Sequence, residues 1–414
     1  MVRKIAAFIL LFVLLYNPPI FGIQITNLVY LLGLGYFILA KKHINRTQGI
    51  LLAWGGIAVC IGTVITLLNG AGDFNMMGYS RLFSSFFCSL LIVDLLKKDN
   101  DNFTEYTVPE WIGYAALVQT GIVLLAFCVP GIHSFLLVLC GGASSYSDKL
   151  EALSAFRGIG WTFAQFSDFA ICQGIALLCM VTVYSDPSSG RPRHKIPVII
   201  AFLAIFLSGI LIARTFQLTM FLAFILWGII QLRTQGTAML LKNLIIGAIF
   251  LVIIIVIAFQ VFSDYLSEDT IKWAFEIYQN LGDTGQIESA STNELKDYWF
   301  LPDNCNTLFF GDGRFVGLHN HPTYAQSDVG YINSIYYWGI VGSFFYYGSI
   351  CESYALSIRT TSNKVIKYLC LTILATILIY NVKGVANGFP YAWLILHGIL
   401  ASKRKRTPSL KSYE

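Results

Sequence analysis

Charged residues are scarce in this chain, making up only 12% of its 414 residues, whereas hydrophobic residues make up 56% and the mean hydropathy is +0.65. So few charges cannot cover the surface of a soluble fold of this length. Apolar runs close to the roughly 20 residues that a helix needs to cross the hydrocarbon recur along the whole chain, without the alternation of a transmembrane barrel. The sequence therefore predicts an all-α polytopic membrane protein.

Motifs that would indicate other activities are also missing. There is no internal repeat of roughly 20 to 50 residues, no low-complexity tract and no Walker-type or dinucleotide-binding glycine pattern, which argues against a nucleotide site. Eight of the nine cysteines lie in apolar stretches and only Cys305 lies in a clearly polar loop, so we expect packing residues and not a disulfide framework. The basic tail that begins at Lys403 indicates contact with lipid headgroups and not with nucleic acid.

Twelve spans account for the apolar runs and place both termini in the cytoplasm. We expect them at residues 5–16, 20–40, 49–68, 78–96, 109–129, 166–184, 196–213, 215–231, 241–262, 329–350, 368–381 and 386–401. In this arrangement 20 of the 28 Lys and Arg residues lie in cytoplasmic segments, in agreement with the positive-inside rule. The first run could instead be a signal-peptide core, and the short run at 131–141 is expected to be re-entrant or interfacial.

These spans divide the chain into three regions: residues 1–262, with nine helices and an outer segment at 130–165; residues 263–328, a large outer loop; and residues 329–414, with three helices and the basic tail. The loop carries eleven acidic and three basic residues, which favours a soluble cap over a membrane-surface binder. An amphipathic helix is expected at 267–282. Aromatic residues of the loop could stack on sugar rings or act as membrane-interface anchors: Trp273, Tyr298 and Trp299.

Four arginines are expected on the outer face, against the charge bias of the other basic residues: Arg81, Arg157, Arg214 and Arg314. Arg214 is the clearest, because it lies at the turn between two apolar runs, with Gln217 one turn away. A charge at a helix centre costs about 2.5 to 3.5 kcal/mol on insertion scales, so a guanidinium near the hydrocarbon needs a partner. That partner could be a diphosphate held by charge-assisted hydrogen bonds. It could also be a carboxylate such as Asp168 or Asp328, or the lipid headgroups.

Glycines accompany two of these arginines. The RGIG segment at Arg157 contains two glycines that permit close backbone approach, and the Gly-Asp-Gly turn at 311–313 could form an anion-binding nest of backbone amides before Arg314. The alternatives are a clasp between Arg157 and Asp168, and an ordinary turn with a solvated arginine.

The loop also contains candidate general bases, His321 and Asp328. His319 and His321 share a face only in an extended strand, and a third metal ligand would have to come from Asp312 or Asp328, so we expect no metal. Either histidine could instead be an ordinary hydrogen-bonding residue of the loop.

Two stretches carry a resemblance to a known family. The F-G-D-G-R turn at Phe310–Arg314 and the segment SDVGYINSIYYWGIVG at Ser327–Gly342, together with a late large outer loop, resemble the O-antigen polymerase (Wzy) and O-antigen ligase superfamily. In these families an outer loop closes with an acidic or histidine motif ahead of a helix ending in G-(I/L)-(V/I)-G. Arg157 and Arg214 also occupy the places where that superfamily carries arginines.

The resemblance implies a glycosyltransferase of the C-type (GT-C) membrane architecture. The donor would be a glycan on undecaprenyl diphosphate and the acceptor a repeat unit on the same lipid, with no cofactor and no metal. The base would be His321 or Asp328, and His321 is favoured because ligases of this superfamily use a loop histidine; direct attack would give inversion. The diphosphate would be bound by Arg214, Arg157, Arg314, Arg81 and Gln217, with Arg314 also stabilising the departing charge.

The resemblance favours a polymerase over a ligase, because SDVGY stands where a ligase typically shows a histidine-asparagine pair, although His319-Asn320 lies nearby. A flippase for the same lipid would be expected to show two similar halves, which this sequence lacks. The implied location is the bacterial inner membrane, with the site on the periplasmic side. The implied pathway is lipopolysaccharide biosynthesis, with a chain-length regulator and a flippase as partners.

Overall fold

The computed structural model of the chain consists almost entirely of helices. It describes residues 2–21, 23–70, 77–98, 100, 102–141, 154, 157–163, 166–191, 195–262, 276, 279–280, 282–283, 290–314, 327 and 329–403. The helices of the first half are α1 (Val2–Tyr16), α2 (Thr26–Leu39), α3 (Arg46–Leu68), α4 (Met77–Lys98), α5 (Thr107–Cys128), α6 (Pro130–Gly141) and α8 (Ser167–Ser185). Those that follow are η1 (Pro187–Ser189), α9 (Lys195–Ile212), α10 (Phe216–Phe262), α12 (Ala290–Asp297), α13 (Cys305–Phe310), α14 (Gly330–Thr360), α15 (Lys364–Tyr380) and α16 (Phe389–Lys403).

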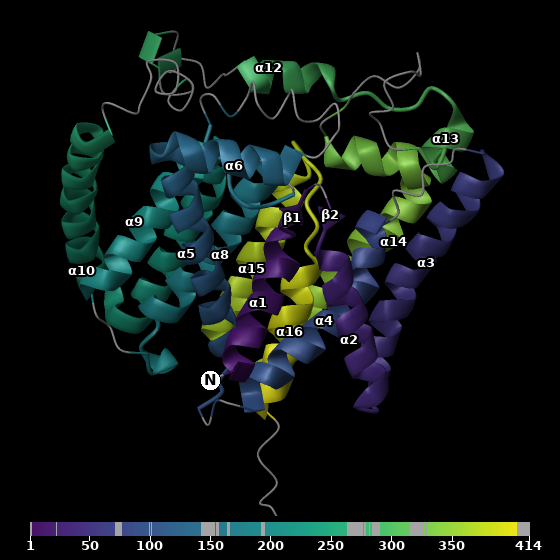
Figure 1. Cartoon of the computed structure of the whole chain (residues 1–414), viewed down its shortest axis with the longest axis horizontal. Coiled ribbons are helices and arrows are strands. Elements are labelled where there is room, and N and C mark those ends of the chain that lie inside the picture. The colour runs from purple at the N-terminus through teal and green to yellow at the C-terminus, as the bar shows by residue number, and fades with distance from the viewer. Residues whose placement is uncertain are drawn as a thin grey trace, which may run out of the picture.

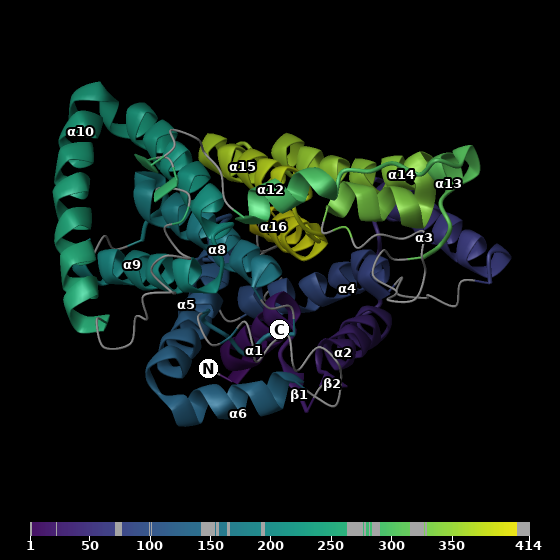
Figure 2. The same cartoon turned by 90° about the horizontal axis from the view of Figure 1, so that it is seen from above.

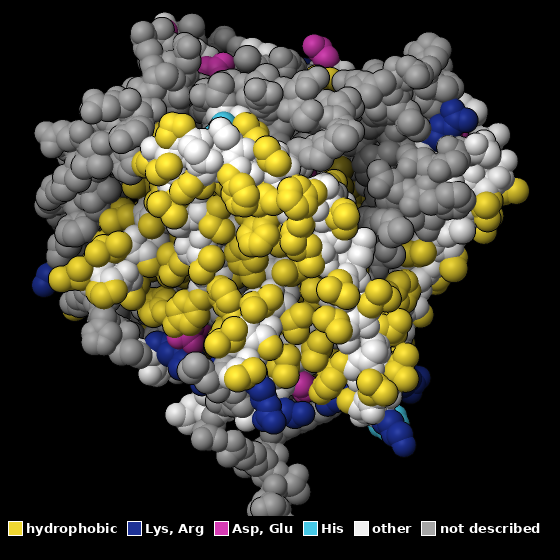
Figure 3. Space-filling view, in the orientation of Figure 1, with side chains coloured by type: hydrophobic (Ala, Val, Ile, Leu, Met, Phe, Trp, Pro, Cys, Tyr) yellow, Lys and Arg dark blue, Asp and Glu magenta, His cyan; other side chains and the backbone are white. Residues whose placement is uncertain are grey.

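The described helices suit a lipid bilayer. Four are long and apolar enough to cross a membrane: Arg46–Leu68, Thr107–Cys128, Asp168–Ser185 and Phe216–Lys242. Shorter apolar helices lie at Thr26–Leu39, Pro130–Cys140 and Ile196–Ile212. A broad face of the molecule is covered by hydrophobic side chains (Figure 3). Such a surface is unfavourable in water but favourable in contact with lipid. The chain is therefore an all-helical membrane protein, whereas its total of twelve spans stays a prediction.

The run expected as one span at 20–40 is divided, and that expectation was wrong at its start. Strands β1 (Pro19–Ile20) and β2 (Ile23–Gln24) form a short antiparallel hairpin before α2 begins at Thr26. Two prolines, Pro18 and Pro19, cannot donate the backbone hydrogen bonds of a helix, and Asn17 takes a positive φ of 44°. Helices α1 and α2 therefore run antiparallel on either side of the hairpin (Figure 1).

Two of the long helices bend at a glycine. Helix α10 is interrupted at Gly236 (φ 80°), in the gap between the spans expected at 215–231 and 241–262. Helix α14 is interrupted at Gly339 (φ 66°) and continues to Thr360, ten residues beyond the end expected at 350. Only glycine takes such backbone angles without strain, so each break is encoded by its residue type.

Large aromatic side chains fill the centre of the bundle. Trp338 and Tyr337 of α14 and Trp393 of α16 are fully buried. All nine cysteines are free. Four of them are buried and pack in the core, as expected, whereas Cys60 and Cys305 are exposed.

Basic residues distinguish one end of the bundle from the other. At one end, the basic end, α2, α4, α8 and α16 terminate, and the N-terminus lies there (Figure 1). At the other end, the distal end, α12 and α13 lie over the bundle and α6 lies across it, roughly perpendicular to α5. The crosswise position of α6 fits the interfacial placement expected for residues 131–141.

Candidate functional site

The segment at 157–163 is fixed at the distal end from two sides. The backbone N–H of Gly158 donates to the carbonyl of Leu211 at the end of α9, over 2.8 Å. The indole Nε1 of Trp161 donates to the carbonyl of Pro19 in the β hairpin, also over 2.8 Å. These hydrogen bonds connect the N-terminal hairpin to α9 through the segment that contains Arg157.

Close packing explains both glycines of this segment. A Cβ at Gly158 would come within 3.0 Å of Val123 in α5. A Cβ at Gly160 would come within 2.5 Å of the side-chain amide of Gln119 and of the ring of Phe169. The expected close backbone approach is confirmed, and it sets the position of Arg157 against α5 and α8.

Arg157 stacks on the ring of Phe166, with 5.2 Å between the guanidinium carbon and the ring centroid. Phe166 precedes α8 with φ 58°, a strained conformation for a residue with a side chain, of the kind that clusters at functional sites. Burial and, to a smaller extent, the positive charge of Arg214 lower the pKa of Arg157 to about 10. The hydrogen bond from Gly158 to Leu211 brings the segment of Arg157 to the turn that contains Arg214.

Arg214 occupies the turn between α9 and α10, as the sequence predicted. The backbone N–H of Gln217 donates to the carbonyl of Arg214 over 3.0 Å, which fixes the first turn of α10. The guanidinium forms an ion pair with the carboxylate of Glu276, and the side chains of this pair are only 10% and 26% exposed. One partner of Arg214 is therefore a carboxylate of the outer loop, Glu276, which sequence reasoning had not named.

Arg81 lies on α4, one turn into the helix from the distal end. Its charge acts on Tyr346 of α14 and on Cys172 of α8, and the charge of Asp168 acts on Cys172 as well. Arg81 is therefore in the region of the start of α8.

The turn before Arg314 donates hydrogen bonds to α14 next to the break in that helix. The backbone N–H groups of Asp312 and Gly313 donate to the carbonyls of Tyr336 and Tyr337, over 2.8 and 3.1 Å. The break at Gly339 deprives these carbonyls of their usual partners one turn later, and the turn replaces those partners. The expected anion-binding nest is therefore filled by the protein itself.

Arg314 lies apart from Arg157 and Arg214. It follows α13, which lies beside α14 and α3, whereas Arg157 and Arg214 lie by the ends of α8 and α9 on the opposite side of the molecule (Figure 2). The structure thus brings Arg157, Arg214 and Gln217 together with Glu276, and it does not bring Arg314 to them.

The aromatic candidates differ from one another. Tyr298 packs against Val329 and Ile332 beside the start of α14, whereas Trp299 is 50% exposed and available to a ligand. Three predicted site residues lie outside the described part of the chain: Trp273, His321 and Asp328. The same holds for most of the amphipathic helix expected at 267–282.

Where the structure describes the chain, no three His, Cys, Asp or Glu side chains are grouped so that they could hold a metal ion. The polar groups of the site are instead guanidiniums, a carboxylate and amides. Such groups bind an anion by charge-assisted hydrogen bonds.

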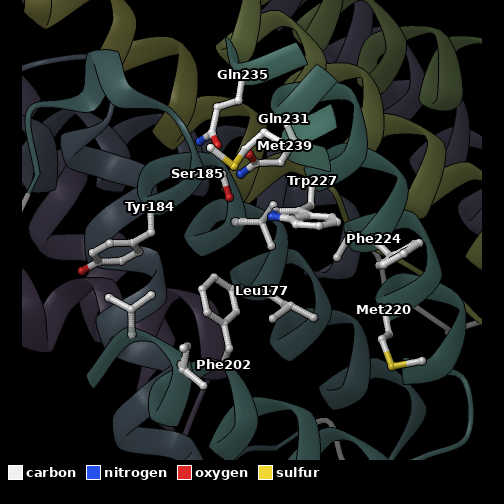
Figure 4. A pocket seen from close by; sticks show the side chains of 14 residues that line it. Leu177, Tyr184, Ser185, Phe202, Met220, Phe224, Trp227, Gln231, Gln235 and Met239 are labelled. Atoms are coloured by element: carbon white, nitrogen blue, oxygen red, sulfur yellow. The ribbon is translucent and has the colours of Figure 1, made fainter. Parts of the chain in front are cut away.

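An apolar cavity of about 630 Å³ lies between α8, α9 and α10 (Figure 4). Its wall includes Phe202, Met220 and Trp227, and Gln231 and Gln235 gather towards one end. Met220 lies one turn after the start of α10, and Gln235 lies about 22 Å further along at 1.5 Å per residue. The cavity therefore begins close to the Arg214 turn and extends towards the basic end.

Sequence reasoning missed two residues of this site. Glu276 was counted only as one acid of the loop, and nothing in its local pattern links it to Arg214, 62 positions earlier. Phe166 gave no signal either, since an aromatic residue before an apolar helix is common in a membrane protein.

Comparisons of the chain with family models, with curated proteins and with solved structures gave no match.

Proposed function

We propose that this chain is a membrane glycosyltransferase that polymerises oligosaccharide repeat units carried on undecaprenyl diphosphate. The observation that carries the proposal is the pair formed by Arg157 and Arg214, which the hydrogen bond from Gly158 to the carbonyl of Leu211 brings together at the distal end. Keeping two like charges together is unfavourable, and a bound anion would relieve the repulsion between them.

A diphosphate fits this pair chemically. Each guanidinium offers a planar fork of donors to phosphate oxygens, and two forks match two phosphate groups. Glu276 already bonds to one fork with a carboxylate oxygen, which stands in for the oxygen that a phosphate would present. As the glycosidic bond to the diphosphate breaks, the departing charge grows, and fixed cations stabilise that state more than the starting one.

The apolar cavity supports a lipid-linked donor. A prenyl chain attached to the diphosphate could enter between α9 and α10 beside the Arg214 turn and lie along Met220 and Trp227. Burial of a chain in such a cavity contributes roughly 0.8 kcal/mol per CH₂ group.

The remaining features of the proposal come from the resemblance and from charge. His321 or Asp328 would take the proton of the acceptor hydroxyl, and Trp299 would contact sugar. The basic end would face the cytoplasm of a bacterium, by the positive-inside rule, and the arginine pair would face the periplasm. The finer features proposed are a GT-C architecture with twelve spans and both termini in the cytoplasm.

Reconstitution with defined substrates tests the proposal. Purified protein in liposomes, given only repeat units on undecaprenyl diphosphate, is expected to produce a ladder of longer glycans. Transfer that requires a lipid A core acceptor would show a ligase, and translocation without new glycosidic bonds would show a flippase.

An arginine-to-lysine series then tests the pair itself. Arg157→Lys and Arg214→Lys keep the charge but lose the fork, so each is expected to lower turnover at least tenfold while the protein remains folded. The matched control is Arg359→Lys, because Arg359 is exposed at the basic end and pairs only at the surface with Glu352. Full activity of both lysine variants would refute the role of the fork.

A further inference from the structure

A second cavity lies at the basic end, between the turn after α2 and the ends of α4 and α16, and it has a volume of about 230 Å³. Three lysines line it, Lys41, Lys42 and Lys97, together with one acid, Asp94. The lysines outnumber the acid, so the wall carries two net positive charges with histidine neutral.

The basic side chains of this cavity are held in place by the fold. The ammonium of Lys42 lies 2.6 Å from a carboxylate oxygen of Asp94, and the hydroxyl of Tyr36 donates to the same oxygen over 2.8 Å. The ammonium of Lys97 donates to the carbonyl of Ala401 over 2.5 Å, which connects α4 to α16. These lysines are therefore positioned and not freely solvated.

The backbone at Lys41 gives an independent indication of a built site. Lys41 has φ 46°, in the left-handed region, where a residue with a side chain costs roughly 1 to 2 kcal/mol. Glycine would occupy this position without that cost, yet the chain carries a lysine there, next to Lys42. A strained residue that places a charge at a cavity suggests that the charge is used.

The surroundings of the cavity select an amphiphilic ligand. Ile38 and Leu39, just before Lys41 on α2, are 64% and 85% exposed, as expected for side chains that contact lipid. Lys and Arg side chains lie along the lower edge of the apolar face, with acidic side chains among them (Figure 3). The cavity is smaller than the roughly 300 to 1,000 Å³ that encloses a drug-sized ligand, so it suits a headgroup whose chains stay outside.

We propose that this cavity binds the phosphate of an anionic phospholipid headgroup in the leaflet at the basic end, with the acyl chains along α2. Basic pockets between helices at this level of a membrane bind such headgroups. The inference does not depend on the glycosyltransferase proposal, since the cavity and the arginine pair lie at opposite ends of the bundle.

Native mass spectrometry of the full-length protein in detergent tests the site with phosphatidylglycerol and, as the neutral comparison, phosphatidylcholine. Wild-type protein is expected to prefer phosphatidylglycerol at least tenfold, and the double variant Lys42→Gln/Lys97→Gln is expected to lose that preference. The matched control is Lys364→Gln, an exposed lysine at the same end outside the cavity. Equal binding by the double variant and the control would overturn the proposal.

Two further variants distinguish a loss of lipid binding from misfolding. Asp94→Asn keeps a hydrogen-bond acceptor for Tyr36 but removes the negative charge, so binding of phosphatidylglycerol is expected to rise several-fold, an effect that damage to the fold could not produce. Lys41→Gly relieves the backbone strain, so the melting temperature is expected to hold or rise while binding falls. Weaker binding by Asp94→Asn would contradict the assignment.

Inorganic phosphate distinguishes the two sources of the phosphate group. Displacement of bound phosphatidylglycerol by millimolar phosphate would support recognition of the phosphate group, which the lipid and the free ion share. Protection of the wild-type protein by phosphate alone, with no preference between the two lipids, would overturn the lipid as the source.

Discussion

Replacement of Arg157 by glutamine separates a binding role from a structural one. In the folded protein the charged form of Arg157 is disfavoured by burial and by Arg214, which together lower its pKa to about 10. Each pKa unit corresponds to about 1.4 kcal/mol, so the lowering would amount to at most about 3.5 kcal/mol, and solvent around the partly exposed side chain reduces this to on the order of 1 to 2 kcal/mol. Stacking of the charged guanidinium on Phe166 stabilises the folded state by about 0.5 to 1 kcal/mol.

The balance predicts that Arg157→Gln leaves the protein as stable as before or more stable by about 0.5 to 1 kcal/mol, while activity falls steeply. The direction of this effect on stability does not change at working pH. A base with a lowered folded pKa is charged in both states well below pH 10, so the penalty is fully present there and is lost progressively as the pH rises from the folded pKa towards the unfolded one.

Thermal unfolding in detergent and turnover of a lipid-linked donor are measured together on Arg157→Gln. We expect an unchanged melting temperature, or one raised by roughly 1 to 2 °C, with at least a hundredfold loss of turnover. Arg359→Gln, which removes a surface pair with Glu352, is expected to change neither. A clear fall in melting temperature with activity retained would mean that Arg157 is a structural clasp, and the proposed anion site would be refuted.

Three further predictions concern other parts of the molecule. Gly339→Ala is expected to destabilise the protein by at least about 2 kcal/mol, because φ is 66° and a Cβ would meet the backbone of Phe309, whereas Gly121→Ala, with open space around it, is expected to be neutral or slightly stabilising in thermal unfolding. Glu276→Gln removes the carboxylate paired with Arg214, so pyrophosphate is expected to inhibit the variant at lower concentration than the wild type, and a rise in its inhibition constant would contradict competition for the same guanidinium. Trp227→Ala is expected to raise KM for a long-chain lipid-linked donor but not for one with a short prenyl chain, while Trp54→Ala, which packs on Phe345 away from the cavity, is expected to leave both unchanged.

The apolar helices could be predicted because they depend on local sequence. Apolar runs of suitable length define them, and the glycines at 236 and 339 lie where the chain bends. The hairpin at 19–24 was missed because Ile20, Phe21 and Ile23 are as apolar as the helix that follows, and hydropathy does not register the effect of two prolines.

The candidate site could be predicted only in part, since it depends on contacts between distant segments. Arg157 and Arg214 stood out because a charge in an apolar run is costly and therefore unusual. Their proximity to each other follows from the hydrogen bond between Gly158 and Leu211, which no local pattern encodes. The turn at 311–313 was expected to bind an anion because its glycines permit a nest, but the broken helix α14 had carbonyls to satisfy.

The position of that turn also limits how the proposed reaction could be arranged. Residues 311–313 bond to α14 at Tyr336 and Tyr337, and Ser327 is fixed beside the start of α14 by its hydrogen bond to the carbonyl of Tyr298. The residues on both sides of the segment that contains the candidate bases therefore lie next to α14. The arginine pair lies across the molecule, by α8 and α9 (Figure 2). Under the proposed function, the sugar would be held between base and diphosphate, as direct displacement with inversion requires.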